Sequence, residues 1–250
     1  MVEQTATAPV SATPATPDAT AAQAAPATPA TQAAQAAQAA GHRGMPEKRV
    51  AIARAARTVF GREGFTRTSV DAIAAEAGVS KRTIYNHFAD KEQLFQSVIL
   101  EGASTVAATQ AKIADRHLRK IVDLRGDLID FGLDRVGSLT TFAEHWALVR
   151  TIEAEALHIR PAVLEAWQEA GPRETHRVLT HWMTEFADRG LLLVPDPDEA
   201  ARHLNLLTFI AVAQPTFYGA IPMPAERIAE VVASGVTAFL KVYRATGATT

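Results

Sequence analysis

One stretch of the chain decides the fold. Residues 68–92 read TSVDAIAAEAGVSKRTIYNHFADKE. Thr68 and Asp71 have the spacing of a capping box, in which the hydroxyl accepts from a helical amide while the carboxylate reaches back, so a helix is expected to begin here. Gly78 readily adopts the positive φ that ends a helix, and Ser80 is a favourable N-cap for the next one. Two short helices joined by a three-residue turn predict a helix-turn-helix.

The second of these helices, expected over 81–87, carries side chains suited to a DNA groove. Ile84 is expected to face inward, and the outward residues are Lys81, Arg82, Thr83, Tyr85, Asn86 and His87. Arg82 can donate two hydrogen bonds to guanine and Asn86 can pair with adenine, and their spacing of four residues puts both on one helical face. We expect phosphate oxygens to be contacted by the hydroxyl and basic side chains of Thr68, Ser80, Lys81, Thr83, Tyr85, His87 and Lys91.

Several of these side chains have an alternative interpretation. In this alternative, Tyr85 is a half-buried side chain that packs within the domain, and His87 caps the carboxyl end of its helix. Lys81 and Arg82 are then solvated charge. A short basic cluster before the first helix is either a DNA-contacting arm or a solvated face; it comprises Arg43, Lys48 and Arg49.

Four features occur together in residues 49–96: an amphipathic helix, Gly-Phe-Thr-Arg-Thr-Ser at 64–69, Tyr-Asn-His-Phe at 85–88 and an Asp-Lys-Glu cap at 90–92. In this combination the segment closely resembles the DNA-binding domain of the TetR/AcrR family of transcriptional regulators. The helical remainder resembles, more weakly, the AefR-like C-terminal type.

The resemblance implies a two-fold dimer formed by the last two helices, which binds an inverted-repeat operator in double-stranded DNA. It also implies release of the DNA when a small molecule enters the C-terminal half. A symmetric operator requires a symmetric protein. The positions expected at the dimer interface are His203, Leu207, Ile210, Ile228, Val232, Val236 and Phe239. For the apolar ones, internal core is the alternative.

Beyond this segment, apolar residues recur at helical spacing from Pro46 onward without convincing alternation at period two, so the folded part is predicted to be all-α. The first helix is expected between Pro46 and Gly64, and a fourth is capped at Asp90. Glycine and proline stop signals divide the remainder into about five or six helices, the last two over 198–218 and 225–244. These signals lie at 137–138, 160–161, 171–172, 190, 195–197 and 222–224.

Composition bounds the class of protein. The 250 residues are 48% hydrophobic and 21% charged, as in soluble globular proteins, and no run of 18 apolar residues suggests a membrane span. The absence of cysteine excludes disulfides, cysteine-ligated metals and a cysteine nucleophile, and favours a reducing, cytoplasmic location. The formal charge is +4 over residues 43–100 and −4 over 101–250. A basic module on an acidic body indicates that one part meets a polyanion.

Three parts follow from these patterns. Residues 1–44, rich in Ala, Thr, Pro and Gln, predict a disordered tail because they hold little apolar surface. Residues 45–92 are predicted to form the helix-turn-helix domain, and residues 93–246 a helical ligand-binding and dimerisation domain.

The aromatic residues of the C-terminal half either form core or line a ligand cavity. Two tryptophans adjoin histidines, which supply polar contacts for a ligand. The predicted effector pocket comprises Phe142, His145, Trp146, His181, Trp182 and Phe209, and its ligand is expected to be a small hydrophobic or aromatic molecule.

The sequence therefore predicts a ligand-responsive transcriptional regulator that acts as a homodimeric repressor. The alternative keeps the helix-turn-helix and makes the C-terminal half a protein-docking or dimerisation module. No nucleophile elbow, dinucleotide loop, Walker loop or zinc-protease motif is present, so an enzyme is not expected. No cofactor or metal is expected either, because Glu155 and His158 share a helix face without a second pair of ligands.

Overall fold

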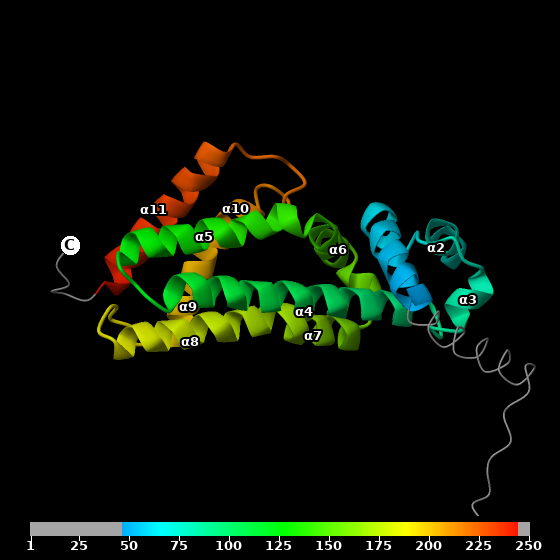
Figure 1. The fold of residues 1–250 in the computed structure, drawn as a ribbon, viewed down its shortest axis with the longest axis horizontal. Coiled ribbons are helices and arrows are strands. Elements are labelled where there is room, and N and C mark those ends of the chain that lie inside the picture. Colours follow the sequence, from blue (N-terminus) through cyan, green and yellow to red (C-terminus); the bar gives the residue numbers. More distant parts are fainter. Residues whose placement is uncertain (1–46, 245–250) are drawn as a thin grey trace, which may run out of the picture. The chain divides into compact units, whose positions relative to one another are not determined.

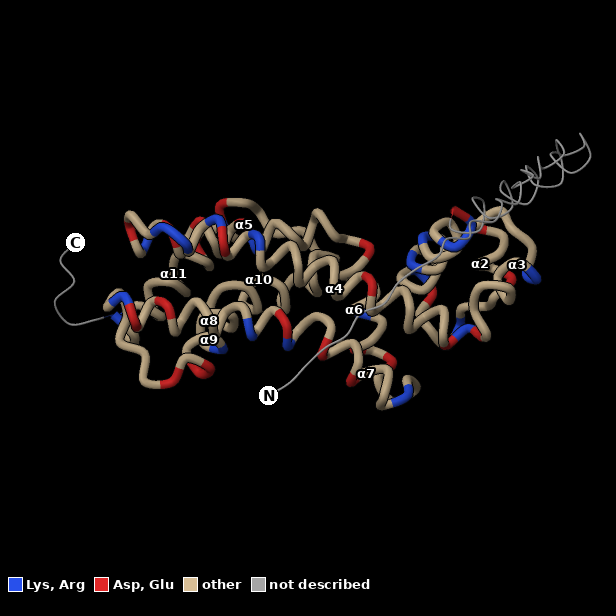
Figure 2. Tube along the Cα trace, turned by 60° about the horizontal axis from the view of Figure 1, so that its bottom comes forward, with Lys and Arg blue, Asp and Glu red and all other residues tan. Residues whose placement is uncertain are grey.

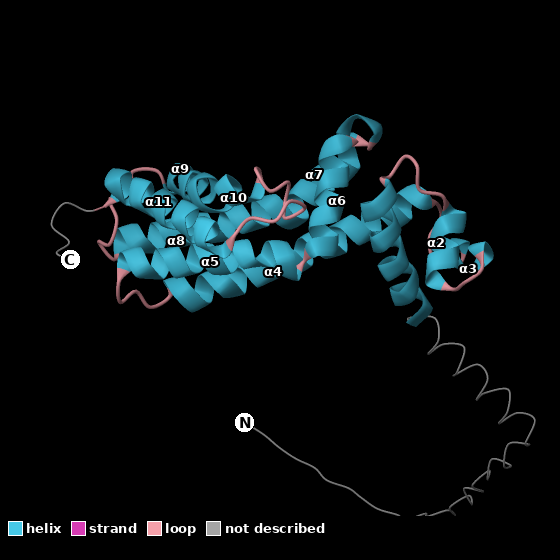
Figure 3. Cartoon of the chain, turned by 90° about the horizontal axis from the view of Figure 1, so that it is seen from above, coloured by secondary structure: helices cyan, strands magenta, loops and turns pink. Residues whose placement is uncertain are grey.

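The computed structural model describes residues 47–244, and all of its regular elements are helices (Figures 1 and 3). Within these residues the backbone forms no strand beyond an isolated antiparallel bridge between Leu192 and Arg244. The predicted all-α class is confirmed. No helix of this part of the chain combines the length and apolar character needed to cross a bilayer. The predicted tail, residues 1–44, lies outside the described residues together with Arg43 of the basic cluster.

The N-terminal helices occur in the expected order. Helical residues 47–63 come first, followed by α2 (Val70–Ala77) and α3 (Lys81–Tyr85). Gly64 and Gly78 follow two of these helices with φ of 86° and 64°, the left-handed conformation that glycine adopts without a steric penalty. The three helices enclose a small apolar core that includes Ile52, Val59, Phe60, Ile73, Ile84 and Phe88.

The remaining helices pack around a long helix, α4 (Lys91–Leu118), which lies between α5 and α8 (Figure 1). The Asp90 carboxylate caps α4 by accepting from the amide of Gln93 at 2.7 Å, as predicted. The other elements are α5 (Leu124–Thr141), α6 (Ala143–Ala154), η1 (Ala156–His158), α7 (Pro161–Gln168), η2 (Glu169–Arg173), α8 (Glu174–Asp188), α9 (Pro197–Asn205), η3 (Leu206–Ile210), α10 (Ala211–Ala213) and α11 (Ala225–Tyr243).

Two predicted stop signals are wrong, because the helices continue through them. Gly171-Pro172 lies inside η2, a π-helical turn that joins α7 to α8. Proline in an α-helix interior removes a donor and clashes with the carbonyl four residues back, and the wider π turn relieves both problems. A Cβ on Gly171 would lie 2.9 Å from the Cβ of Ala103, so this glycine permits close packing on α4. Gly137-Ser138 likewise lies within α5.

The face of α11 predicted for the dimer lies in the core of the subunit. Val232, Val236 and Phe239 are each 0% exposed and pack toward α5 and η3. A Cβ on Gly235 would overlap the carbonyl oxygen of Leu207 in η3. An apolar helical stripe has the same sequence pattern whether it meets its own subunit or a partner, which explains the error. The other predicted positions are half-buried: His203, Leu207, Ile210 and Ile228.

Candidate nucleic-acid interface and internal cavity

The turn between α2 and α3 is fixed by main-chain and side-chain caps. The amide of Gly78 donates to the carbonyl of Ala75 at 3.2 Å, and the amide of Val79 donates to the carbonyl of Ala74 at 3.0 Å. The hydroxyl oxygen of Ser80 then accepts from the amide of Thr83 at 3.1 Å. These contacts set the direction in which α3 leaves the turn, and hence which of its side chains face outward.

Three side chains at α3 are exposed and have no hydrogen-bond partner among the described residues. Arg82, Tyr85 and Asn86 are exposed, Tyr85 to 48%, and their side chains form no hydrogen bond with another described residue. The helix ends at Tyr85 rather than at the predicted His87, but Asn86 still has helical backbone angles, so it shares a face with Arg82. Figure 2 shows a Lys/Arg position, drawn in blue, beside the label of α3.

Other predicted contact residues at α3 already have partners. Lys81 pairs with Asp71 at 2.9 Å, and the hydrogen bond and charge of that carboxylate raise the pKa of the lysine. The hydroxyls of Ser80 and Thr83 lie 2.8 Å apart. His87 is half-buried after the end of α3. Ser80, Lys81, Thr83 and His87 all keep some exposure, so burial does not prevent any of them from contacting DNA.

Thr68 and Lys91 hold the loop before α2. Thr68 is 2% exposed and its hydroxyl donates to the carbonyl of Gly64, so the N-cap of α2 is Ser69 rather than the predicted Thr68. The Lys91 ammonium donates to the carbonyls of Phe65, Thr66 and Thr68 at 2.9 to 3.3 Å. The buried hydroxyl of Thr68 is committed to the fold, which corrects its predicted contact with phosphate. Lys91 is half-buried, and its contact with phosphate stays a prediction.

The basic cluster before the first helix is also partly committed. Arg49 donates to the carbonyl of His87 at 3.2 Å, and its guanidinium lies 4.5 Å from the ring centre of Phe88. These contacts tie the first helix to the end of α3. Lys48 is exposed.

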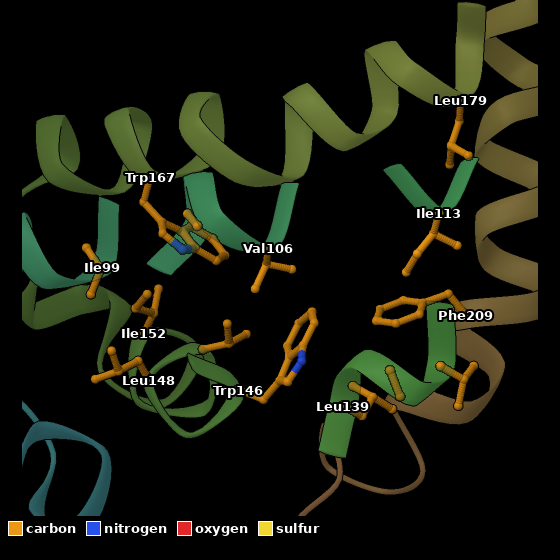
Figure 4. Packing of buried hydrophobic residues seen from close by; sticks show 14 of the residues in the cluster. Ile99, Val106, Ile113, Leu139, Trp146, Leu148, Ile152, Trp167, Leu179 and Phe209 are labelled. Atoms are coloured by element: carbon orange, nitrogen blue, oxygen red, sulfur yellow. The ribbon is translucent and has the colours of Figure 1, made fainter. Parts of the chain in front are cut away.

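A cavity of about 270 Å³ that opens to the surface beside Glu153 lies among α4, α5, α6, α7 and η3. Of the predicted pocket residues, His145, Trp146 and Phe209 line it. Figure 4 shows Trp146, Phe209 and a third aromatic residue, Trp167, converging near Val106. The prediction missed Trp167, although it is one of only three tryptophans in the sequence.

The remaining predicted pocket residues lie elsewhere. Helix α8 buries Leu179, Met183 and Phe186; position 181 points away from this face, whereas Trp182 lies at its edge, packed against the core but not at the cavity. His181 is exposed, and the ring of Trp182 lies 6.3 Å from that of Phe186. Phe142 lies at the junction of α5 and α6 and does not line this cavity.

Polar groups from three helices meet at the cavity wall. The Arg135 guanidinium of α5 donates to Gln110 of α4 at 2.9 Å and to Asn205 of α9 at 2.8 Å. Burial lowers the pKa of Arg135 to about 10. Burial also lowers the pKa of His145 to about 4, and the positive charge of Arg57 adds to this effect. At neutral pH the wall therefore presents a charged guanidinium and a neutral imidazole.

Helix α6 connects the cavity with the N-terminal domain. His145 and Trp146 near its start line the cavity, and near its end the hydroxyl of Thr151 donates to the carbonyl of Phe60 at 3.3 Å. Just past the helix, one carboxylate oxygen of Glu155 accepts from both the amide and the hydroxyl of Thr66, at 2.7 and 2.5 Å. Glu155 is therefore engaged in the fold, and within residues 47–244 no three His, Asp or Glu side chains gather as metal ligands would.

Comparison with known proteins places the chain in a family. The family model of tetR-family bacterial regulatory proteins matches residues 52–98, and that of the AefR-like transcriptional repressor C-terminal domain matches residues 127–245. Together the two ranges cover more than half of the chain. The chain belongs to the TetR family. The predicted resemblance is thus confirmed in both halves, and the family consists of regulatory proteins rather than enzymes.

Individual TetR-family relatives agree with this assignment. The regulator UidR of Escherichia coli K12 is 32% identical over 111 residues, which are 44% of this chain and 52% of UidR, so the match spans about half of that relative. A solved TetR-family regulator from Mesorhizobium loti has a TM-score of 0.72 at 29% identity, covering 80% of this chain and 98% of that one. The flavonoid-responsive regulator FrrA has a TM-score of 0.58 at 30% identity, with the same coverage.

Proposed function

We propose that this TetR-family chain is a transcriptional repressor that binds an inverted-repeat operator as a homodimer and releases it when a small molecule occupies the cavity. The observation that carries the proposal is the α3 face, where Arg82, Tyr85 and Asn86 are exposed without a partner among the described residues. In this proposal residues 45–92 bind DNA, and residues 93–246 bind the ligand and form the dimer.

The exposed α3 face has the chemistry to read bases. Arg82 and Asn86 are the two side chains that pair with guanine and adenine edges in the major groove, and their helical spacing presents both together. Lys81, Thr83 and Tyr85 flank them and supply contacts to phosphate. Ser69 is exposed at the start of α2 and takes the phosphate role that the buried Thr68 cannot fill.

The dimer is assigned to the outward face of α11, opposite its core face. Ser234, Ala238 and Val242 are exposed along this face, and Leu206 is exposed on η3. Small and apolar side chains allow two copies to pack closely across a two-fold axis.

Ala238→Arg places a long charged side chain on that face and is expected to convert the dimer into monomers in sedimentation experiments. Ala108→Arg, at an exposed position of α4, is the matched control and is expected to remain dimeric. A dimeric Ala238→Arg variant would refute this placement of the interface.

Release of DNA is assigned to α6, because the same helix lines the cavity and touches the N-terminal domain. A ligand that shifts Trp146 displaces α6, and the contacts of Thr151 and Glu155 carry the displacement to Phe60 and Thr66. Phe60 lies in the first helix, and Thr66 lies in the loop that leads to α2. The name of the relative FrrA states that it responds to flavonoids, which supports small-molecule control in this chain as well.

A binding experiment tests the DNA-reading role. Labelled DNA from beside the gene and a shuffled duplex of equal length are titrated with the full chain at several salt concentrations. We expect selective binding, and we expect Arg82→Ala to weaken it by about 1–3 kcal/mol, the discrimination of one bidentate base contact. Arg119→Ala, which removes an exposed arginine at the end of α4, is the control. Equal binding to both duplexes, lost steeply with salt, would contradict the proposal.

A second candidate follows from the size of the cavity. At about 270 Å³ it lies just below the usual range of about 300–1,000 Å³ for ligand pockets. The C-terminal half is then a docking and dimerisation module, and no small molecule changes the affinity for DNA.

A further inference from the structure

Arg135 is a buried cation without a counter-ion. Its side chain is 2% exposed, and among the described residues no carboxylate forms an ion pair with it. Its partners are the neutral amides of Gln110 and Asn205 and the faces of two phenylalanine rings. A buried charge that lacks an opposite charge is strongly destabilising, so the fold retains an unfavourable group at this position.

The guanidinium also has unused donor capacity. Its Nη1 atom forms no hydrogen bond, and the same is true of Nε1 of Trp167. Both residues line the cavity described above. Nδ1 of His145 also lacks a partner, but it lies beside Gly102, which lines a different pocket. Buried polar groups are almost always satisfied, and two unsatisfied donors around a single cavity indicate that a ligand completes them.

The charge of the cavity selects the ligand's head group. A carboxylate carries one negative charge and accepts two parallel hydrogen bonds from a guanidinium, which matches an arginine whose Nη1 has no partner and whose Nη2 makes a single hydrogen bond. A phosphate monoester brings nearly two charges and three oxygens, for which the wall offers no second cation. Glu153, exposed at the cavity and bonded to the hydroxyl of Tyr218 at 2.5 Å, further disfavours a dianion.

The walls select the rest of the ligand. Trp146 packs beside Phe209 with ring centres 5.6 Å apart and stacks on Tyr218 at 5.5 Å with an angle of 9°. Trp167 lies on the facing helix (Figure 4). Flat aromatic walls favour a planar or slender apolar body.

We propose, building on the function proposed above, that the effector is a small organic monocarboxylate whose head group pairs with Arg135 and whose apolar body lies among Trp146, Trp167 and Phe209. Binding supplies the missing counter-ion of the guanidinium. The ligand class is thereby narrowed from hydrophobic molecules in general to carboxylic acids.

The test compares acids with their neutral amides, which have nearly the same shape. Benzoate, 3-phenylpropionate and hexanoate are each titrated against the matching amide into the full chain without DNA. Tryptophan fluorescence and the shift in Tm report binding, since two of the three tryptophans line the cavity. We expect at least one acid to bind ten-fold or more tightly than its amide.

Variants locate the preference for acids. Arg135→Met keeps the bulk of the side chain and removes its charge. The variant is therefore expected to bind each acid and its amide with affinities that differ by no more than about two-fold. Arg189→Met is the matched control, because Arg189 also lies over a phenylalanine ring and donates to carbonyls, but outside the cavity. If Arg135→Met does not fold, Trp167→Phe, which removes only an indole donor and some ring area, is expected to weaken acid binding by several-fold.

Two results would overturn the inference. The first is that every amide of the panel binds as tightly as its acid, and the second is that phenyl phosphate binds more tightly than benzoate. Because these titrations contain no DNA, they are independent of the proposed repressor function. The affinity for DNA is then measured separately with the bound acid present. If it is unchanged, the carboxylate site is retained and only its role in releasing DNA is refuted.

Discussion

Lys91 and Arg82 are both basic residues of the N-terminal domain, yet their side chains are placed for different tasks. Arg82 is exposed and has no partner among the described residues, whereas Lys91 donates to three carbonyls of the preceding loop. The α3 face follows from helical periodicity, which is why the sequence was sufficient to predict it. The carbonyls that hold Lys91 lie 23 to 26 residues away along the chain, and only the fold brings them together.

The histidine and the arginine of the cavity wall, His145 and Arg135, differ in the same way. His145 was predicted for the cavity because it adjoins a tryptophan, and it lines the cavity. Arg135 was not predicted, although its sequence position gives a signal. It lies one helical turn from Phe131 and Leu139 on the buried face of α5, where a charged residue needs an explanation.

The buried imidazole of His145 makes a prediction for stability in acid. Its pKa is about 4 in the folded chain and about 6.5 when unfolded. Between these pH values the unfolded state binds more protons than the folded state, so stability falls as pH falls through this window. The shift corresponds to about 3 kcal/mol, the contribution lost by pH 4.

Urea unfolding at several pH values checks this prediction. His145→Gln is expected to show a smaller loss of stability between pH 6.5 and 4 than the unsubstituted chain. His181→Gln, at an exposed histidine of α8, serves as the control. Parallel pH profiles for the chain and its His145→Gln variant would show that this imidazole does not limit stability.

At the scale of elements, glycines decide how closely the helices pack. Gly235 on α11 lies against the main chain of η3, and Gly171 lies against α4. The sequence predicted where most helices begin and end, because caps and breakers are local. It failed at Gly171-Pro172, where tertiary packing keeps a helix through a strong stop signal, and at the core face of α11, where periodicity does not reveal the partner.

A pair of identical substitutions tests this packing. Gly235→Ala places a methyl group on the carbonyl oxygen of Leu207, which the backbone of η3 cannot easily vacate, and is expected to destabilise the fold by about 1–3 kcal/mol or more. Gly137→Ala meets no atom within 4 Å in α5 and is expected to stabilise it by up to about 1 kcal/mol. Denaturant unfolding measures both values. Equal effects of the two substitutions would contradict the described contact of α11 with η3.

At the scale of the whole molecule, one helix joins two sites of different chemistry. The N-terminal module presents the exposed face of α3, the C-terminal half contains a cavity, and α6 touches both the cavity and the first helix. The exposed face of α3 and part of the cavity lining could be predicted from local sequence, but not the connection between them. The bond between Glu155 and Thr66 spans 89 residues, and no local pattern marks it.

The proposed function requires a symmetric dimer that reads an operator through α3. Hydroxyl-radical footprinting of the full chain on DNA from beside its gene tests this claim most directly. We predict protected patches related by a two-fold axis and centred about 34–36 Å apart, one helical turn of DNA, or at a multiple of that distance. Arg82→Ala is expected to weaken both patches together, so that a higher protein concentration is needed to produce them. A single unsymmetric patch, or uniform protection along the duplex, would contradict the account.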